Sequence, residues 1–222
     1  MFTSTERRPK RLPRQEAKKM TIAIIGTGNI GAGLARVFSN ARHDVVLANA
    51  NGSTEAAAKL GVRAASVTEA VKAADTVILA TPYDAAQSIT QAADFTGKVV
   101  IDVSNPVTAD FSGLQLGQTS SAAEEIAHLL PGATVVKAFN TVFAQHYAGD
   151  LTLEGRKIQT FVAADDDTTR RAVVALANSV GFEAVEAGPL SNARYLEALG
   201  YMNIQFGFML NRRTGIAPIW LG

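Results

Sequence analysis

The chain contains no cysteine and no long apolar run. The lack of cysteine excludes disulfide frameworks, thiolate nucleophiles and cysteine-ligated metal sites, and it fits the cytoplasmic location that we expect. No stretch approaches the length of about 18 apolar residues that a membrane span requires, so we expect no membrane partner. Hydrophobic residues make up 47% and charged residues 18% of the sequence, which is an ordinary globular balance.

The basic residues are unevenly distributed. Seven of the 21 lysines and arginines lie within residues 1–19, against two of the 20 acidic residues. The rest of the chain therefore has 14 basic and 18 acidic residues, a net charge of about −4. This balance predicts no nucleic-acid partner for the body of the protein. We predict a disordered basic tail over residues 1–19, and a nucleic-acid or membrane arm is the alternative.

Strand and helix patterns alternate from residue 21 onward. Short apolar runs predict strands at residues 21–25, 44–48, 76–80, 98–102 and 133–139. Helical spacing predicts a helix over 31–40, and Ser121 with Glu124 forms a capping-box pattern that opens a helix over 121–130. Such alternation predicts a parallel sheet with helices on both faces.

The pattern continues in the last third of the chain. It predicts a strand at 156–164, a capped helix at 165–181, a strand at 182–188 and a long, mostly apolar helical segment at 189–210. We find no internal repeat and no linker. The sequence therefore predicts a single domain over residues 20–222.

A glycine-rich run follows the first predicted strand. Residues 26–31 read Gly-Thr-Gly-Asn-Ile-Gly and lead directly into a predicted helix. This GxGxxG pattern is weak alone, but between a strand and a helix it is typical of a dinucleotide site. Gly26 permits the tight turn, Gly28 lets a pyrophosphate approach the main chain, and Gly31 lets the helix pack on the strand. We therefore predict an α/β fold of the Rossmann type, with a doubly wound, mostly parallel sheet and a helical C-terminal segment.

The loop after the second strand bears on the choice of nucleotide. NAD-selective sites place an acid about 20 residues after the glycines, but residues 48–53 read Ala-Asn-Ala-Asn-Gly-Ser. Glu55 would repel a phosphate, and the nearest cations are Arg42 and Lys59. We expect NADP, with NAD possible. The neutral donors available to a 2′-phosphate are the amide of Gly52 and the side chains of Asn49, Asn51, Ser53 and Thr54.

Several blocks of the sequence resemble the coenzyme F(420)-dependent NADP oxidoreductase family, including its NADPH-dependent reductase relatives. The same fold also resembles the cytosolic domain of membrane ferric reductases. The resemblance covers residues 20–222, and its last two blocks are far more specific than the glycine loop. The blocks are "IAIIGTGNIGAGLA" (22–35), "VSNPV" (103–107), "SAAEEIAHLLPGATVVKAFNTV" (121–142), "GFEAVEAGPLSNARYLEALGYMNIQFGF" (181–208) and "GIAPIW" (215–220).

The resemblance implies an oxidoreductase that transfers a hydride between NADP(H) and a small-molecule acceptor. That acceptor would be coenzyme F(420) or a flavin, FMN or FAD, bound as an exchangeable co-substrate. The resemblance also implies a homodimer in which residues 189–222 help to build the acceptor pockets. In the family the nucleotide loop commonly reads Ser-Arg, where this chain has Ala50 and Asn51.

The resemblance and the predicted strand ends together give a set of candidate site residues. For the nucleotide they are Gly26, Thr27, Gly28, Asn29, Ile30, Gly31, Asn49, Ala50, Asn51, Ser53, Thr81, Pro82, Asn105, Ala138, Asn140 and Thr141. For the acceptor pocket they are Pro106, Phe139, Asn203 and Met209.

Hydride transfer between two flat rings requires proximity and the exclusion of water, not a nucleophile. We accordingly predict no catalytic side chain and no metal. The three histidines, His43, His128 and His146, are widely separated and show no metal-ligand spacing; His146 is the one nearest the expected rim of the pocket. The acidic run 165–167 is expected to cap a helix rather than hold a cation.

Two other readings stand beside this one. A β-hydroxyacid or imino-acid reductase opens with a similar domain but adds a large helical one, and the hydroxyacid type places a catalytic lysine there. Residues 189–222 contain Arg194, Arg212 and Arg213 but no lysine. A second alternative is a non-catalytic NADP(H) sensor. A third is a relative that reduces ferric complexes, or a small carbonyl compound or imine.

Overall fold

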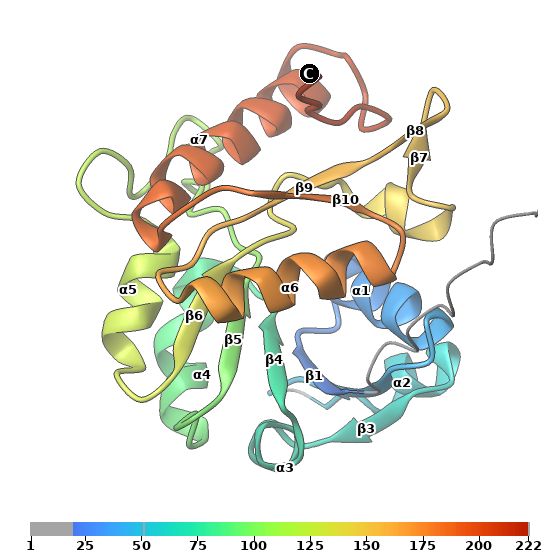
Figure 1. Ribbon diagram of the computed structural model, residues 1–222, viewed down its shortest axis with the longest axis vertical. Helices are drawn as coiled ribbons and strands as arrows, with labels where there is room; N and C mark the ends of the chain where they lie inside the picture. Colours follow the sequence, from blue (N-terminus) through green and yellow to red (C-terminus); the bar gives the residue numbers. More distant parts are fainter. Residues whose placement is uncertain (1–19, 51, 222) are drawn as a thin grey trace, which may run out of the picture.

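A six-stranded parallel sheet forms the centre of the protein (Figure 1). The computed structural model describes residues 20–50 and 52–221, so the predicted tail 1–19 and Asn51 lie outside the described residues. The strand order β3-β2-β1-β4-β5-β6 reverses direction between β1 and β4, as in Rossmann folds. The predicted fold class is thus confirmed. The strands are β1 (Thr21–Ile25), β2 (Asp44–Ala48), β3 (Arg63–Ala65), β4 (Thr76–Leu79), β5 (Val99–Asp102) and β6 (Thr134–Lys137).

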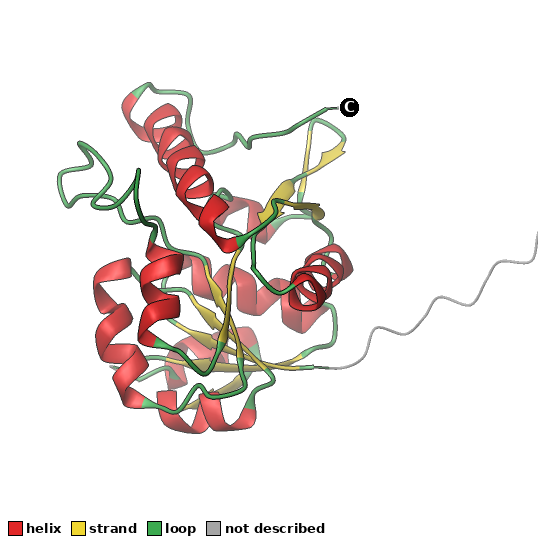
Figure 2. Cartoon of the chain, turned by 60° about the vertical axis from the view of Figure 1, so that its left-hand side comes forward, coloured by secondary structure: helices red, strands yellow, loops and turns green. Residues whose placement is uncertain are grey.

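Helices cover both faces of this sheet (Figure 2). Successive side chains of a strand point to opposite faces, so Ile22 and Ile24 enter one core, and Ala23 and Ile25 enter the other. The first core is covered by α1 (Asn29–Asn40), α2 (Thr54–Leu60) and α6 (Asp167–Ser179). The second is covered by α3 (Val67–Ala73), α4 (Ala86–Ala92) and α5 (Ala122–Leu129).

The last strands leave the central sheet. β9 (Gln159–Val162) and β10 (Glu183–Glu186) form a parallel pair, which meets β6 through one antiparallel bridge between Lys137 and Ala163. The predicted strand 156–164 is therefore wrong in part. Its first residues turn back in a hairpin, where β8 (Arg156–Lys157) pairs with β7 (Thr152–Leu153).

The predicted helical segment 189–210 is helical but not uniform. It begins with a 3-10 turn η3 (Leu190–Asn192), continues as α7 (Ala193–Ile204) and ends in a π-helical turn η4 (Gln205–Met209). α7 passes close to the loop after β5, since a Cβ on Gly200 would lie 2.5 Å from Oδ1 of Asn105. Two further 3-10 turns are η1 (Tyr83–Ala85) and η2 (Ala144–Ala148).

Among the described residues, no helix has both the length and the apolar character needed to cross a membrane.

Candidate functional site

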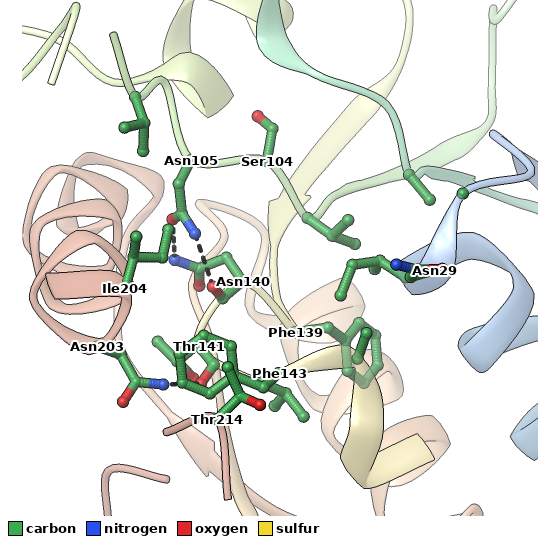
Figure 3. Close-up of a pocket in the computed structure, with 18 of the residues that line it drawn as sticks. Asn29, Ser104, Asn105, Phe139, Asn140, Thr141, Phe143, Asn203, Ile204 and Thr214 are labelled. Carbon is green, nitrogen blue, oxygen red and sulfur yellow. Dashed lines mark hydrogen bonds between the residues drawn. The ribbon is translucent and has the colours of Figure 1, made fainter. Parts of the chain in front are cut away.

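A cavity of about 670 Å³ opens at the carboxyl edge of the sheet (Figure 3). One wall is the glycine loop, the floor is formed by the ends of β4, β5 and β6, and the far wall is α7 with η4. Open α/β sheets bind ligands at this edge, next to the point where the strand order reverses. None of the described residues that line the cavity carries a charge.

The glycine loop is shaped for a phosphate. Gly26 has φ +122°, and a Cβ there would lie 2.2 Å from the Ala80 carbonyl oxygen. A Cβ on Gly31 would lie 2.0 Å from the carbonyl oxygen of Gly26, whereas one on Gly28 would meet nothing within 4 Å. No side chain caps the start of α1 at Gly28. The N–H groups of its first turn thus face open space, and a pyrophosphate fits there.

The loop after β2 is tied to the glycine loop. Nδ2 of Asn49 donates to Oγ1 of Thr27 across 3.0 Å, and the amide of Gly52 donates to the Asn49 carbonyl. The expectation for Ser53 needs correction: its side chain is buried and its hydroxyl donates to the Leu47 carbonyl. That proton is therefore not available to a 2′-phosphate.

The cations near this loop are occupied or distant. Nζ of Lys59 lies 2.7 Å from Oε1 of Glu55, so the two exposed charges offset each other. Arg42 precedes β2, whereas the loop follows it. A strand rises about 3.3 Å per residue, which places the main chain of Arg42 at the opposite edge of the sheet.

Three buried polar atoms in the cavity wall have no hydrogen-bond partner within the described protein. They are Oγ of Ser104, Oδ1 of Asn140 and Oγ1 of Thr141. Leaving such an atom unpaired costs about 1–3 kcal/mol, so these atoms are available to hydrogen-bond a ligand or ordered water in the cavity.

Side-chain amides join the floor of the cavity to α7. Asn105 and Asn140 bond each other, with Nδ2 of Asn140 donating to Oδ1 of Asn105 and Nδ2 of Asn105 donating to the Asn140 carbonyl, both at 2.8 Å (Figure 3). Nδ2 of Asn140 also donates to the Leu196 carbonyl, and Nδ2 of Asn203 donates to the Thr141 carbonyl. These bonds fix the separation between the sheet and the helix.

The part of the cavity next to α7 is rich in aromatic side chains. Phe111, Phe143 and Phe208 line it, and the rings of Phe143 and Phe208 meet edge to face at 5.7 Å. The carbonyl of Phe111 accepts from the hydroxyl of Tyr201 and from Nε2 of Gln205, which ties the loop after β5 to α7.

Half of the expected site residues line this cavity. The structure brings together Gly28, Asn29, Ile30, Thr81, Pro82, Asn105, Phe139, Asn140, Thr141 and Asn203. The other described candidates do not line the cavity: Gly26, Thr27, Gly31, Asn49, Ala50, Ser53, Ala138, Pro106 and Met209.

For three of these residues, the structure shows why they do not line the cavity. Ala138 is completely buried beneath the floor. The Pro106 carbonyl accepts from the amide of Gln115, so this residue shapes the following loop. Met209 is half exposed, because the π-helical turn brings Phe208 to the cavity in its place.

The remaining polar candidates have structural roles. His128 is exposed, and His43 is buried against Ser179, with its pKa lowered by burial. Nε2 of His146 lies 3.1 Å from the Ile216 carbonyl and so holds the C-terminal chain. The acidic run at 165–167 caps α6 as predicted, since Asp166 accepts from the Thr169 amide. The described residues contain no acid or histidine cluster able to hold a metal ion.

Several lining residues were not identified from the sequence. Gly200 could have been found, because a glycine inside a helical pattern indicates close approach by another group. The others gave no local signal: Ser104, Phe111, Phe143, Gln145, Ile204, Phe208 and Thr214.

Comparisons with known proteins find similarity to oxidoreductases. Residues 21–106 match the family described as NADP oxidoreductase, coenzyme F(420)-dependent. The metalloreductase STEAP3 of Rattus norvegicus is 31% identical over 189 residues, which are 83% of this chain and 37% of that protein. The chain thus spans a little over a third of the length of the curated relatives it matches.

Solved structures share the fold of the chain. A hypothetical protein from Sinorhizobium meliloti is 36% identical, with a TM-score of 0.71 over 78% of this chain and 88% of that one. A candidate F(420)-dependent NADP reductase from an Arthrobacter species shares the fold, with a TM-score of 0.76, 23% identity, and coverage of 89% of this chain and 96% of that one.

The fold and the glycine loop define a dinucleotide-binding protein of the Rossmann type. Over residues 21–106 the chain is similar to the coenzyme F(420)-dependent NADP oxidoreductase family.

Proposed function

We propose that the protein transfers a hydride between NADP(H) and a flat redox acceptor of the deazaflavin or flavin type. The observation that carries the proposal is the continuity of the cavity. One uncharged space runs from the open side of Gly28 to the aromatic residues on and facing α7. It offers main-chain donors at one end, unpartnered polar atoms in the middle and aromatic rings at the other.

The nucleotide would lie along this space from phosphate to ring. The main-chain N–H groups of Asn29 and Ile30 would bind the pyrophosphate, which the partial positive charge of the α1 N-terminus favours. Oδ1 of Asn140 and Oγ1 of Thr141 would bond the carboxamide of the nicotinamide, and this would satisfy two of the buried unpartnered atoms. The ring would then face the aromatic end.

When bound, NADPH supplies two electrons and one proton as a hydride and remains as NADP⁺, while the reduced acceptor takes its second proton from solvent. The protein contributes position, because rings stacked about 3–3.5 Å apart react without further groups. Phe143 and Phe208 would hold the acceptor ring by its face or edge and exclude water. The bond from Asn203 to the Thr141 carbonyl keeps α7 at the distance that two rings require.

NADP preference would rest on neutral donors. The Asn49 side chain already bonds Thr27, and the Gly52 amide already bonds the Asn49 carbonyl. The Thr54 hydroxyl and Asn51 remain to meet a 2′-phosphate. This predicts weaker discrimination against NAD than an arginine would provide.

A second copy of the chain is the proposed partner. Large apolar side chains on and after α7 are exposed, and such residues are typical of homodimer interfaces. Sedimentation velocity would test this, and a monomer at micromolar concentration would contradict it. The exposed residues are Tyr195, Met202, Phe208, Met209 and Leu210.

Ferric complexes are the second candidate acceptor, because the chain is similar to a metalloreductase. The experiment is to follow NADPH oxidation by absorbance with coenzyme F(420), FMN, FAD, riboflavin and ferric chelates. We expect turnover well above background with a deazaflavin or flavin. Turnover with ferric complexes alone would identify them as the acceptor. Binding of NADPH without turnover on any acceptor would favour a sensor.

The Gly28→Asp variant tests where the phosphates bind, and Gly28→Ala is its matched control. A Cβ at Gly28 has free space, so the fold should persist, but the carboxylate would meet the pyrophosphate. NADPH binding should be lost, and the Gly28→Ala variant should bind measurably. Unchanged affinity of the aspartate variant would place the phosphates elsewhere.

A further inference from the structure

A charged cluster is buried directly beneath the cavity. Nζ of Lys137 lies 2.5 Å from Oδ2 of Asp102 and 2.7 Å from Oε1 of Glu197, and it donates to the Ser104 carbonyl at 2.7 Å. The three charged side chains are at most 2% exposed. Burying ions costs several kcal/mol each unless they are paired and hydrogen-bonded, and a hydrophobic core would not need them.

The cluster carries one excess negative charge. Two carboxylates face a single ammonium group, and each carboxylate receives further donors. Oε2 of Glu197 accepts from the amide of Ala122 at 3.0 Å, at the N-terminus of α5, which favours an anion. Oδ1 of Asp102 accepts from the amide of Ser104 at 2.9 Å. Burial raises the pKa of Glu197, and Lys137 with the α5 amide opposes that rise.

The cluster is one residue away from the cavity wall. Asp102 and Lys137 are the last residues of β5 and β6, and both bond Ser104, which lines the cavity. The Leu196 carbonyl, next to Glu197, accepts from the lining residue Asn140. No described lining residue has a charge that would offset the field.

Tyr83 is the nearest titratable residue to one edge of the cavity in the sequence. Tyr83 follows the lining residues Thr81 and Pro82. Burial raises the pKa of its hydroxyl, and four acids raise it further: Glu125, Asp84, Glu197 and Asp102.

We propose that the excess negative charge of the Lys137–Asp102–Glu197 cluster makes this site bind NADP⁺ in preference to NADPH, so that bound NADPH is a stronger hydride donor. The inference rests on the proposed function, which places the nicotinamide in this cavity. Loss of the hydride changes the ring from neutral to positive. At about 10 Å and an effective dielectric constant of about 20, one buried charge alters affinity by about tenfold. Asp102 and Glu197 are thus positioning residues that do not touch the ligand.

The test is the ratio of the dissociation constants of NADP⁺ and NADPH, measured by calorimetry. In the Glu197→Gln variant the NADP⁺ constant should rise about tenfold relative to that of NADPH, equivalent to a rise of about 30 mV in the potential of the bound couple. Glu124→Gln is the control. It removes the same charge from the neighbouring pair with Arg194, which is partly exposed and screened, and its ratio should stay within twofold of the wild type.

Asp102→Asn should move the ratio in the same direction. A third measurement needs no substitution. As pH falls through the pKa of Glu197, the dissociation constant of NADP⁺ from the wild type should rise relative to that of NADPH. The groups facing Glu197 are Lys137 of β6, Asp102 of β5 and the amides of α5.

Three outcomes would overturn the inference. The ratio could stay constant in both variants and across pH, or both variants could weaken NADP⁺ and NADPH equally, as a purely structural role predicts. If both variants fail to fold, a flat wild-type pH profile still contradicts the proposal. Wild-type protein that binds neither nucleotide would refute the proposed function itself, whereas binding with an unmoved ratio refutes this inference alone.

Discussion

The two walls of the cavity are built in different ways. On the α1 side the site consists of main chain, where three glycines within six residues create the turn, the open face and the close packing. On the α7 side it consists mainly of side chains from the segments after β5 and β6, from η2, and from α7 and η4. The first wall is one short segment, and the second is assembled from segments up to about a hundred residues apart.

This difference has a physical consequence. Main-chain N–H groups recognise phosphate in any protein with the same turn, so the α1 wall defines the ligand class. In the proposed function, side chains would set which flat molecule fits opposite the nicotinamide, so the α7 wall would define the acceptor. Substitutions on the two walls should therefore change different measured quantities.

The largest effect of a substitution on stability and binding is expected in the main-chain wall on the α1 side. Gly26→Ala forces a Cβ to within 2.2 Å of the Ala80 carbonyl oxygen at φ +122°. It should lower the free energy of unfolding by about 3 kcal/mol or more and abolish NADPH binding. Gly61→Ala is the control, because Gly61 also has a positive φ but open space around it. Its cost should be about 1 kcal/mol. Equal losses in urea unfolding would show that the turn is not sterically determined.

A smaller and more selective effect is expected on the side-chain wall. Asn203→Ala removes the donor to the Thr141 carbonyl and should cost about 1–2 kcal/mol in the free energy of unfolding. Because α7 is then less firmly held, the KM for the acceptor should rise about tenfold while the Kd for NADPH changes less than twofold. Steady-state kinetics and calorimetry measure the two. An equal loss of affinity for nucleotide and acceptor would mean that the two walls do not bind the two ligands separately.

The smallest effect on stability is expected in the nucleotide loop. Asn51→Arg adds a cation where the family commonly has one, and a charge-assisted bond to the 2′-phosphate should tighten NADPH about tenfold relative to NADH. The unfolding midpoint should stay the same. Competition titrations with both nucleotides give the ratio, and an unaltered value would show that this loop does not reach the phosphate.

Local patterns predicted the fold well. The bounds of β1 and β2 were predicted to the residue, since each is a short buried run between turn residues. The strand 156–164 was overpredicted, because a run of nine residues with strand propensity does not show that its first two residues pair backward in a hairpin.

The site could be predicted only where it depends on local sequence. The glycine loop was found from its spacing, whereas Ser53 was misassigned because nothing in the sequence shows that its hydroxyl turns toward the Leu47 carbonyl. Met209 was chosen in place of Phe208 because a π-helical turn shifts the face of the helix by one residue. The pairing of Lys137 with Glu197 joins residues that only tertiary structure brings together.

The central claim is that one cavity holds the nicotinamide of NADP(H) and leaves room for a second flat ring. A crystal structure of the protein with NADP⁺ tests it most directly. The account predicts the pyrophosphate on the main-chain N–H groups of Asn29 and Ile30, the nicotinamide beside Asn140 and Thr141, and open space toward Phe143. A nucleotide bound elsewhere, or side chains filling the space beside the ring, would contradict it.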